Sequence, residues 1–205
     1  MKKEILKELN VEKLNICEPN GEVKMTLFNS QNIPSLILGY EDLLPGHRSK
    51  DGISGIMFYN NEGDECGGLI YGSGKDENGK PNMGMSLTFD KFKQDQVVQL
   101  HLTKSGDQQM YGFSIYDRPD HSIKESLETL KAFNKEENSE KKKTLLSKLR
   151  ENNAQRIFVG SGIDGTPRIS LFDKQGKEKI KILVDDNDNP VLKVNEKVID
   201  LSKLV

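Results

Sequence analysis

The sequence predicts a mainly β protein built from antiparallel hairpins, with a short N-terminal helix and an inserted helical hairpin. Apolar and polar residues alternate over most of the chain, and turns rich in Gly and Asn separate the alternating runs. One segment between these runs has helical spacing instead. Short strands joined by short turns pair antiparallel, so we expect a barrel, a sandwich or a prism-like body.

Composition narrows the class of protein. Hydrophobic residues make up 34% of the 205 residues and charged residues 30%, which fits a modest core under a highly charged surface. The formal net charge of -2 gives no electrostatic reason to bind nucleic acid or an anionic membrane. No run approaches the roughly 20 apolar residues of a membrane span, and the charged first residues do not fit a signal peptide. We therefore expect a cytoplasmic protein without a nucleic-acid or membrane partner.

The first part of the chain, residues 1–118, is expected to form a β-rich body. Ile5, Leu6 and Leu9 have the spacing of a short amphipathic helix over residues 2–9. Alternation over residues 14–27 around a turn at Gly21 then predicts a hairpin. Residues 29–52 are irregular, with a short strand near Leu38, and further alternating runs follow to residue 117.

Residues 119–155 are expected to form a helical hairpin. Ser122 and Glu125 have the spacing of a capping box, in which the serine hydroxyl and the glutamate carboxylate bind free N–H groups of the first turn. A polar break near residue 137 separates this helix from a second one that contains Leu145, Leu146 and Leu149.

Residues 156–205 return to β-hairpin repeats. The phrases that begin at Asp164, Asp173 and Asn187 resemble copies of one turn. Each strand between them has a single apolar face, and isolated hairpins of this kind are marginal in water. Either the sheet of residues 14–117 or a second copy of the chain must cover these faces, and we favour the second copy.

Polar chemistry is densest in the turn between two short apolar runs, at residues 60–68. Three interpretations of this turn are open: a solvated loop, acid–base or hard-cation chemistry by its carboxylates, or an interaction site ordered against Arg48, Arg118 or a basic group of a partner. A second polar turn follows Phe89. The candidate binding or functional residues are Asn61, Glu62, Asp64, Glu65, Cys66, Asp90, Asp95 and Arg118.

Other motifs fail on their context. The pattern G-x-G-x-x-G at residues 160–165 precedes a strand, whereas a dinucleotide site needs a helix there. The Asn- and Asp-rich stretch after Asp185 resembles a calcium loop, but Pro190 stands where that loop needs glycine. The three histidines have no metal-ligand spacing. We predict no metal and no cofactor, and we expect Cys17 and Cys66 to be reduced thiols.

Four phrases carry a resemblance to a family of bacterial proteins of similar length, characterised by Gly-x-x-Phe-[Tyr/Phe]-Asn-x-Glu-Gly-Asp-Glu-Cys-Gly-Gly. They lie at residues 55–69, 89–98, 116–120 and 165–177. No activity, substrate or cofactor is known to us for that family, so the resemblance implies no functional role.

The function expected from the sequence is therefore that of a non-enzymatic binding or self-associating scaffold protein. The partner would be another copy of the chain, with an unidentified protein or small molecule as a further ligand. The absence of a nucleophile–base or metal-ligand pattern favours this hypothesis. The alternative is an enzyme of unknown type that uses Glu62, Asp64 or Glu65.

Overall fold

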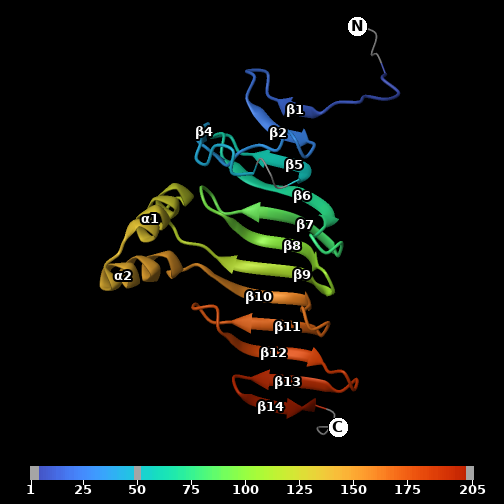
Figure 1. The fold of residues 1–205 in the computed structure, drawn as a ribbon, viewed down its shortest axis with the longest axis vertical. Coiled ribbons are helices and arrows are strands. Elements are labelled where there is room, and N and C mark those ends of the chain that lie inside the picture. Colours follow the sequence, from blue (N-terminus) through green and yellow to red (C-terminus); the bar gives the residue numbers. More distant parts are fainter. Residues whose placement is uncertain (1–4, 49–51, 202–205) are drawn as a thin grey trace.

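The computed structural model describes residues 5–48 and 52–201, and it consists mainly of one open antiparallel sheet. Twelve strands follow one another in the order β1-β2-β5-β6-β7-β8-β9-β10-β11-β12-β13-β14. In Figure 1 they are stacked from β1 near the N-terminus to β14 near the C-terminus. Strands β3 and β4 form a separate two-stranded sheet.

The strand bounds follow the alternating runs of the sequence. They are β1 Lys13–Cys17, β2 Val23–Phe28, β3 Ile37–Leu38, β4 Glu41–Asp42, β5 Ser54–Tyr59, β6 Glu65–Lys75, β7 Pro81–Asp90, β8 Gln96–Ser105, β9 Gln108–Asp117, β10 Ala154–Ser161, β11 Pro167–Phe172, β12 Glu178–Val184, β13 Pro190–Val194 and β14 Lys197–Asp200. Because β9 pairs with β10, the expected β-rich body and the C-terminal repeats belong to one sheet.

The prediction of a mainly β protein made of antiparallel hairpins is confirmed, but two finer expectations are wrong. The sheet does not close into a barrel, because each strand pairs with the next strand along it and β1 and β14 end at opposite edges. Residues 5–9 form no helix, and residues 1–4 lie outside the described residues. Ile5 and Leu6 are 87% and 68% exposed. A helix this short is marginal without a surface to pack on.

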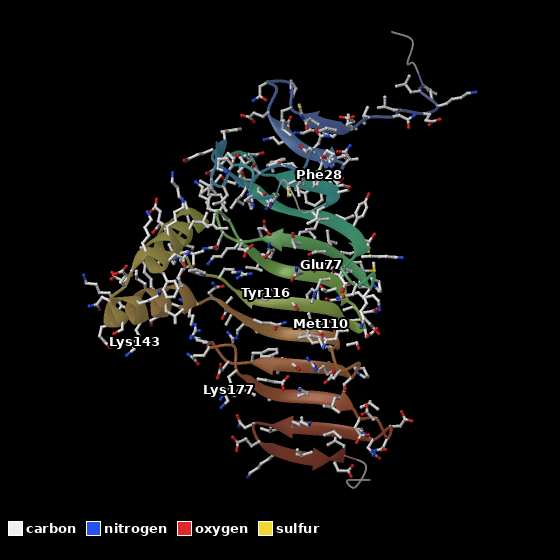
Figure 2. The ribbon with its side chains drawn as sticks, in the orientation of Figure 1. Phe28, Glu77, Met110, Tyr116, Lys143 and Lys177 are labelled. Atoms are coloured by element: carbon white, nitrogen blue, oxygen red, sulfur yellow. The ribbon has the colours of Figure 1, made fainter. Side chains whose placement is uncertain are left out.

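The helical hairpin is confirmed as α1, Ile123–Lys135, and α2, Ser139–Arg150. Both hydrogen bonds of the predicted capping box between Ser122 and Glu125 are present at the start of α1. Figure 1 shows both helices beside one edge of the sheet, and Figure 2 shows Lys143 of α2 well outside the strands. None of the described helices is long and apolar enough to cross a membrane.

Among the described residues, six hairpin turns share one five-residue geometry, and the turn 91–95 differs from them only in having its positive φ at the third residue, Lys93. In the turns 18–22, 60–64, 76–80, 162–166, 173–177 and 185–189, the first N–H donates to the fifth carbonyl and the fourth N–H to the first carbonyl. The fourth residue has positive φ in each, glycine in five turns and Asp188 in the sixth. The expectation that the three C-terminal phrases are copies of one turn is therefore confirmed.

One face of the sheet, here called the apolar face, carries a continuous row of apolar side chains. Cross-strand pairing places one residue of every strand of the sheet in this central row. It runs Leu14, Leu27, Ile56, Leu69, Leu87, Leu100, Phe113, Val159, Ile169, Ile182, Leu192 and Ile199. A second row on the same face, from Ile16 to Lys197, is apolar except at Gly67 and Lys197.

The opposite face, here called the mixed face, contains the most buried residues. The apolar side chains Phe28, Met57 and Phe158 are 6%, 4% and 3% exposed. The hydroxyls of Ser114 and Ser170 lie on this face as well, and both residues are fully buried. The core of the chain is thus assembled on the mixed face, while the face with the regular apolar pattern is left open.

Candidate functional site

The candidate residues lie in turns and at strand ends of β5 to β9. Figure 1 shows the helical hairpin beside the same ends of the strands. The β5–β6 turn, the β7–β8 turn and the end of β9 meet there, and α1 is joined to them through the N–H of Ile123, which donates to the Lys93 carbonyl at 2.8 Å. Sequence-distant acidic and basic groups are thereby brought into one cluster. We call it the acidic edge cluster: Glu62, Asp64, Glu65, Asp90 and Asp95 with Arg48, Lys93 and Arg118.

Asp64 has a structural role in this cluster. Asp64 is fully buried. Its carboxylate accepts the N–H of Gly39 at 2.7 Å and the side-chain amide of Asn60 at 3.0 Å. Tyr40 packs on the same turn so closely that a side chain at Gly63 would collide with its ring. Asp64 therefore fixes the loop of β3 and β4 to the β5–β6 turn, and its lone pairs are committed to that loop.

Glu65 is held by Arg48 in a two-point ion pair. The two terminal nitrogens of the guanidinium, Nη1 and Nη2, each donate to one carboxylate oxygen at 2.9 Å. The two side chains are 9% and 21% exposed, so solvent screens this pair only in part. Arg48 also donates to the Pro34 carbonyl at 3.2 Å. Ordering of the acidic turn by Arg48 was one of the interpretations that the sequence left open, and the structure contains this contact at Glu65.

The outer members of the turn face solvent. Glu62 pairs with Lys93 at 2.6 Å, and both side chains are well exposed. Asn61 is exposed at the tip of the turn. Pairs of this kind contribute little to stability in water, so Glu62 and Asn61 fit the interpretation of a solvated loop.

Arg118 joins the second polar turn to the strand ends. Its guanidinium lies 3.3 Å from Asp95, donates through Nε to the Gln96 carbonyl at 2.8 Å and reaches Asn153 at 2.6 Å. The same group lies 4.9 Å from the centre of the Tyr116 ring. Arg118 therefore links the β7–β8 turn, the start of β8 and the residue before β10.

Among the carboxylates of the cluster, Asp90 is the one whose ionised form is least stabilised. Burial, together with the nearby Glu65 and Asp95 carboxylates, raises the pKa of this carboxyl to about 7, against the lowering effect of Arg48 and Arg118. Within the described residues, its buried Oδ1 atom has no hydrogen-bond partner. At neutral pH Asp90 therefore exists in both protonation states, which is the condition for acid–base exchange.

Cys66 lies beside these carboxylates as a half-buried free thiol, and Cys17 is a free, exposed thiol on β1. Burial raises the pKa of the Cys66 thiol, and Asp90, Glu65 and Asp64 raise it further. A neutral thiol is a poor nucleophile, so this environment does not activate Cys66.

The sequence located most of the cluster but missed the residues that organise it. Asp64 is held by Asn60, Gly39 and Tyr40. Arg118 donates to Asn153, which follows α2 in the chain. The Asn at the first position of a five-residue turn was a usable signal for Asn60. No local pattern connects residue 153 to residue 118.

The rejected motifs are parts of turns and strands. Gly160 lies in β10, and residues 162–166 form one of the five-residue hairpin turns. The Asp185 carboxylate accepts the N–H groups of Asn187 and Asn189, both at 2.9 Å. No cluster of three or more His, Cys, Asp or Glu side chains suited to a metal ion occurs in the described ranges.

No protein-family model and no curated protein matches the chain. The function must therefore be argued from the geometry of the molecule.

Proposed function

We propose that the protein is a non-enzymatic, self-associating scaffold whose copies pair through the apolar face of the sheet. The observation that carries this proposal is the central row, which is apolar in every one of the twelve strands of the sheet. A row with no polar residue is unusual on a sheet face that contacts water, because such a face normally carries polar side chains.

Exposure supports the same proposal. Leu100 and Phe89 are 56% and 52% exposed in the single chain. Monomeric proteins seldom leave contiguous apolar patches of more than a few hundred Å² open to water. The polar hydroxyls of Ser114 and Ser170 on the mixed face are meanwhile fully buried. In the single chain, the apolar face is therefore the face that packs against no other element.

The size of the face suits a stable protein interface. Twelve strands span eleven intervals, which at about 4.8 Å each give a length of about 53 Å. Two rows with their flanks are about 14–20 Å wide at about 6.8 Å per residue pair. The area is therefore about 700–1,000 Å² per copy, close to the roughly 800 Å² that each partner contributes to a standard interface.

A second copy of the chain is the occupant that this face fits best. A copy turned about a two-fold axis presents the same rows over the same length, so that the two sheets stack about 10 Å apart as in a sandwich. Between Leu14 and Ile199 the central row offers no charge to a charged partner. A lipid surface is disfavoured by the absence of Trp and by the net charge of -2.

Replacing Leu100 with aspartate tests the proposal. Leu100 lies in the central row and is largely exposed in the single chain, so Leu100→Asp removes no core contact. In an interface the new carboxylate would be buried without a partner. We expect light scattering to find a multiple of the chain mass for the native protein at micromolar concentration and the single-chain mass for Leu100→Asp.

Val198→Asp is the matched control, because Val198 lies opposite Lys193 on the mixed face of β14. This variant should keep the mass of the native protein. A native chain that stays monomeric throughout the micromolar range would contradict the proposal, as would a Leu100→Asp variant that associates like the native chain. Flotation with lipid vesicles distinguishes a membrane as the occupant.

A second candidate function, an enzyme that uses the acidic edge cluster, is favoured by the raised pKa of Asp90 alone. Two of the carboxylates first assigned to it are committed elsewhere, since Asp64 binds the loop at Gly39 and Glu65 binds Arg48. The third, Glu62, pairs with Lys93 on the exposed side of the turn. The scaffold is therefore the function that the geometry supports better.

A further inference from the structure

A groove of about 410 Å³ lies over the end of the sheet farther from the acidic edge cluster. It crosses β6, β7 and β8 on the mixed face and is bounded by Ile53 before β5. In Figure 2, Glu77 of the β6–β7 turn and Met110 of β9 are labelled on this side of the sheet. The groove belongs neither to the acidic edge cluster nor to the apolar face.

The wall of the groove is a row of neutral hydrogen-bonding side chains. Cross-strand pairing places Ser86 of β7 beside His101 of β8, and Thr103 follows on the same face. Burial lowers the pKa of His101, so its ring is neutral at physiological pH. Among the described lining residues, Lys75 is the one that carries a charge. The groove therefore offers donors and acceptors with little net charge.

The wall is also fixed before any ligand arrives. Gln99 donates to the Ser86 hydroxyl at 2.9 Å and accepts the Tyr116 hydroxyl at 3.1 Å. The His101 ring lies 3.3 Å from the Ser114 hydroxyl, and Ser114 is fully buried. Because Ser86 accepts from Gln99, its own hydrogen is available to donate into the groove. Such a network lowers the entropic cost of binding.

The floor of the groove is bare backbone at a place where the fold does not require it. Gly72 and Gly84 are directly opposite each other in β6 and β7. A Cβ atom added at Gly84 would meet nothing within 4 Å, and this residue is not among those with positive φ. Glycine inside a strand destabilises the fold relative to alanine. What a side chain at Gly84 would fill is the groove itself.

We propose that this groove binds a neutral, hydroxyl-rich small molecule of one or two sugar rings, which lies on the Gly72–Gly84 backbone and hydrogen-bonds with Ser86, His101 and Thr103. The volume lies within the range of small-molecule sites. Uncharged amide, hydroxyl and imidazole groups match hydroxyl groups, which both donate and accept, whereas an anionic or cationic ligand would find few counter-charges. The site is on the face opposite the proposed interface, so the two proposals stand or fall separately.

The experiment is saturation-transfer NMR on the full chain with neutral sugars as probes: glucose, galactose, N-acetylglucosamine, maltose and cellobiose, with glucuronate as the charged counterpart. We expect a saturable signal for at least one neutral probe, stronger than that for glucuronate. Gly84→Leu should reduce it by about tenfold or more. Val198→Phe, a larger side chain on the same face outside the groove, should leave it unchanged.

Stability separates a filled groove from a damaged fold. Gly84→Thr, like Gly84→Leu, introduces a residue better suited to a strand into open space, so its thermal midpoint should equal or exceed that of the native chain while binding is lost. Thr103→Val, which keeps the shape and removes one hydroxyl, should weaken binding without loss of stability. The proposal is overturned if no neutral probe binds saturably, if glucuronate binds more strongly, or if binding survives in both Gly84 variants.

Discussion

The pKa of Asp90 is determined by charged groups that are far apart in the chain. Glu65 is the first residue of β6 and Asp95 lies in the β7–β8 turn, while Arg48 comes from a loop and Arg118 directly follows β9. The two arginines are already paired with Glu65 and Asp95. Asp90 is therefore left with the negative charges of its neighbours only partly neutralised, in a site where burial already disfavours its ionised form.

This arrangement predicts how stability changes with pH. The folded pKa of about 7 lies above the ordinary value of 3.8, so the folded chain retains a proton that the unfolded chain has released. The contribution of Asp90 to stability is present below the ordinary value and is lost as pH rises toward 7. Asp90→Asn should therefore be more stable than the native chain by about 2 kcal/mol near pH 8 and show no such gain near pH 4.

Urea unfolding at one fixed protein concentration across this pH range measures the effect. Asp95→Asn is the control, because Asp95 pairs with Arg118 and its neutralisation should destabilise the chain instead. An Asp90→Asn variant with the same pH dependence as the native chain would show that folding does not raise the pKa of this carboxyl.

At the scale of elements, the features that the sequence predicted well are those specified by adjacent residues. The capping box of α1 and the three C-terminal copies of one turn depend on a few neighbours, and both were predicted. Closure of the sheet depends on strand tilt and stagger summed over twelve strands, which no local pattern contains. The helix expected at residues 2–9 had the right periodicity but no surface for Ile5 and Leu6 to cover.

The candidate site divides in the same way. The acidic turn was predicted from its composition, and Arg48 was named as a partner of its carboxylates. The groove was missed, because Gly84 lies inside one of the alternating runs and the histidines were considered only for metal-ligand spacing. His101 is half-buried and bonded to Ser114. Glycine in the interior of a strand was the local signal available.

The capping box gives a prediction for α1. Ser122 accepts the N–H of Glu125 at 3.4 Å, and the Glu125 carboxylate accepts the N–H of Ser122 at 3.3 Å. Ser122→Ala removes the first of these bonds and should lower the free energy of unfolding by about 1 kcal/mol. Ser122→Asp, which restores an acceptor at the same place, should recover the loss. Circular dichroism at the helical band, followed through urea unfolding, measures both.

The repeated turn gives a second prediction. Asp188 adopts φ of 61° at the position where the other five turns have glycine. A left-handed conformation costs a residue with a side chain about 1 kcal/mol, less for Asp than for most. We therefore expect Asp188→Gly to stabilise the chain by about 0.5 kcal/mol, as measured by chemical unfolding. Gly176→Asp, the reverse change at the matching position of the turn before it, should destabilise it by a similar amount.

At the scale of the molecule, a single-layer sheet poses an unusual problem of burial. Sheets normally bury one face against helices or another sheet, and here both helices stand beside the strands (Figure 1). Side chains of the mixed face cover one another, as where the Arg168 guanidinium lies 5.4 Å from the centre of the Phe158 ring. The apolar face consists mainly of Leu, Ile, Val and Phe, and its side chains stay partly exposed, as at Leu100 and Phe89. In the proposed dimer, the sheet of the second copy supplies the second layer that the single chain lacks.

The charge pattern of the apolar face predicts how that association responds to salt. The central row has no charged residue, and Lys197 is the one charge in the second row. An interface built on these rows gains its free energy from removal of apolar surface from water, which salt does not screen. Raising NaCl from about 0.05 M to about 0.5 M should leave the association constant unchanged or raise it slightly, whereas an interface of ion pairs would weaken. Sedimentation equilibrium at the two salt concentrations measures the constant. A fall of about tenfold or more at high salt would mean that the copies meet through the charged edges of the sheet rather than through its apolar face.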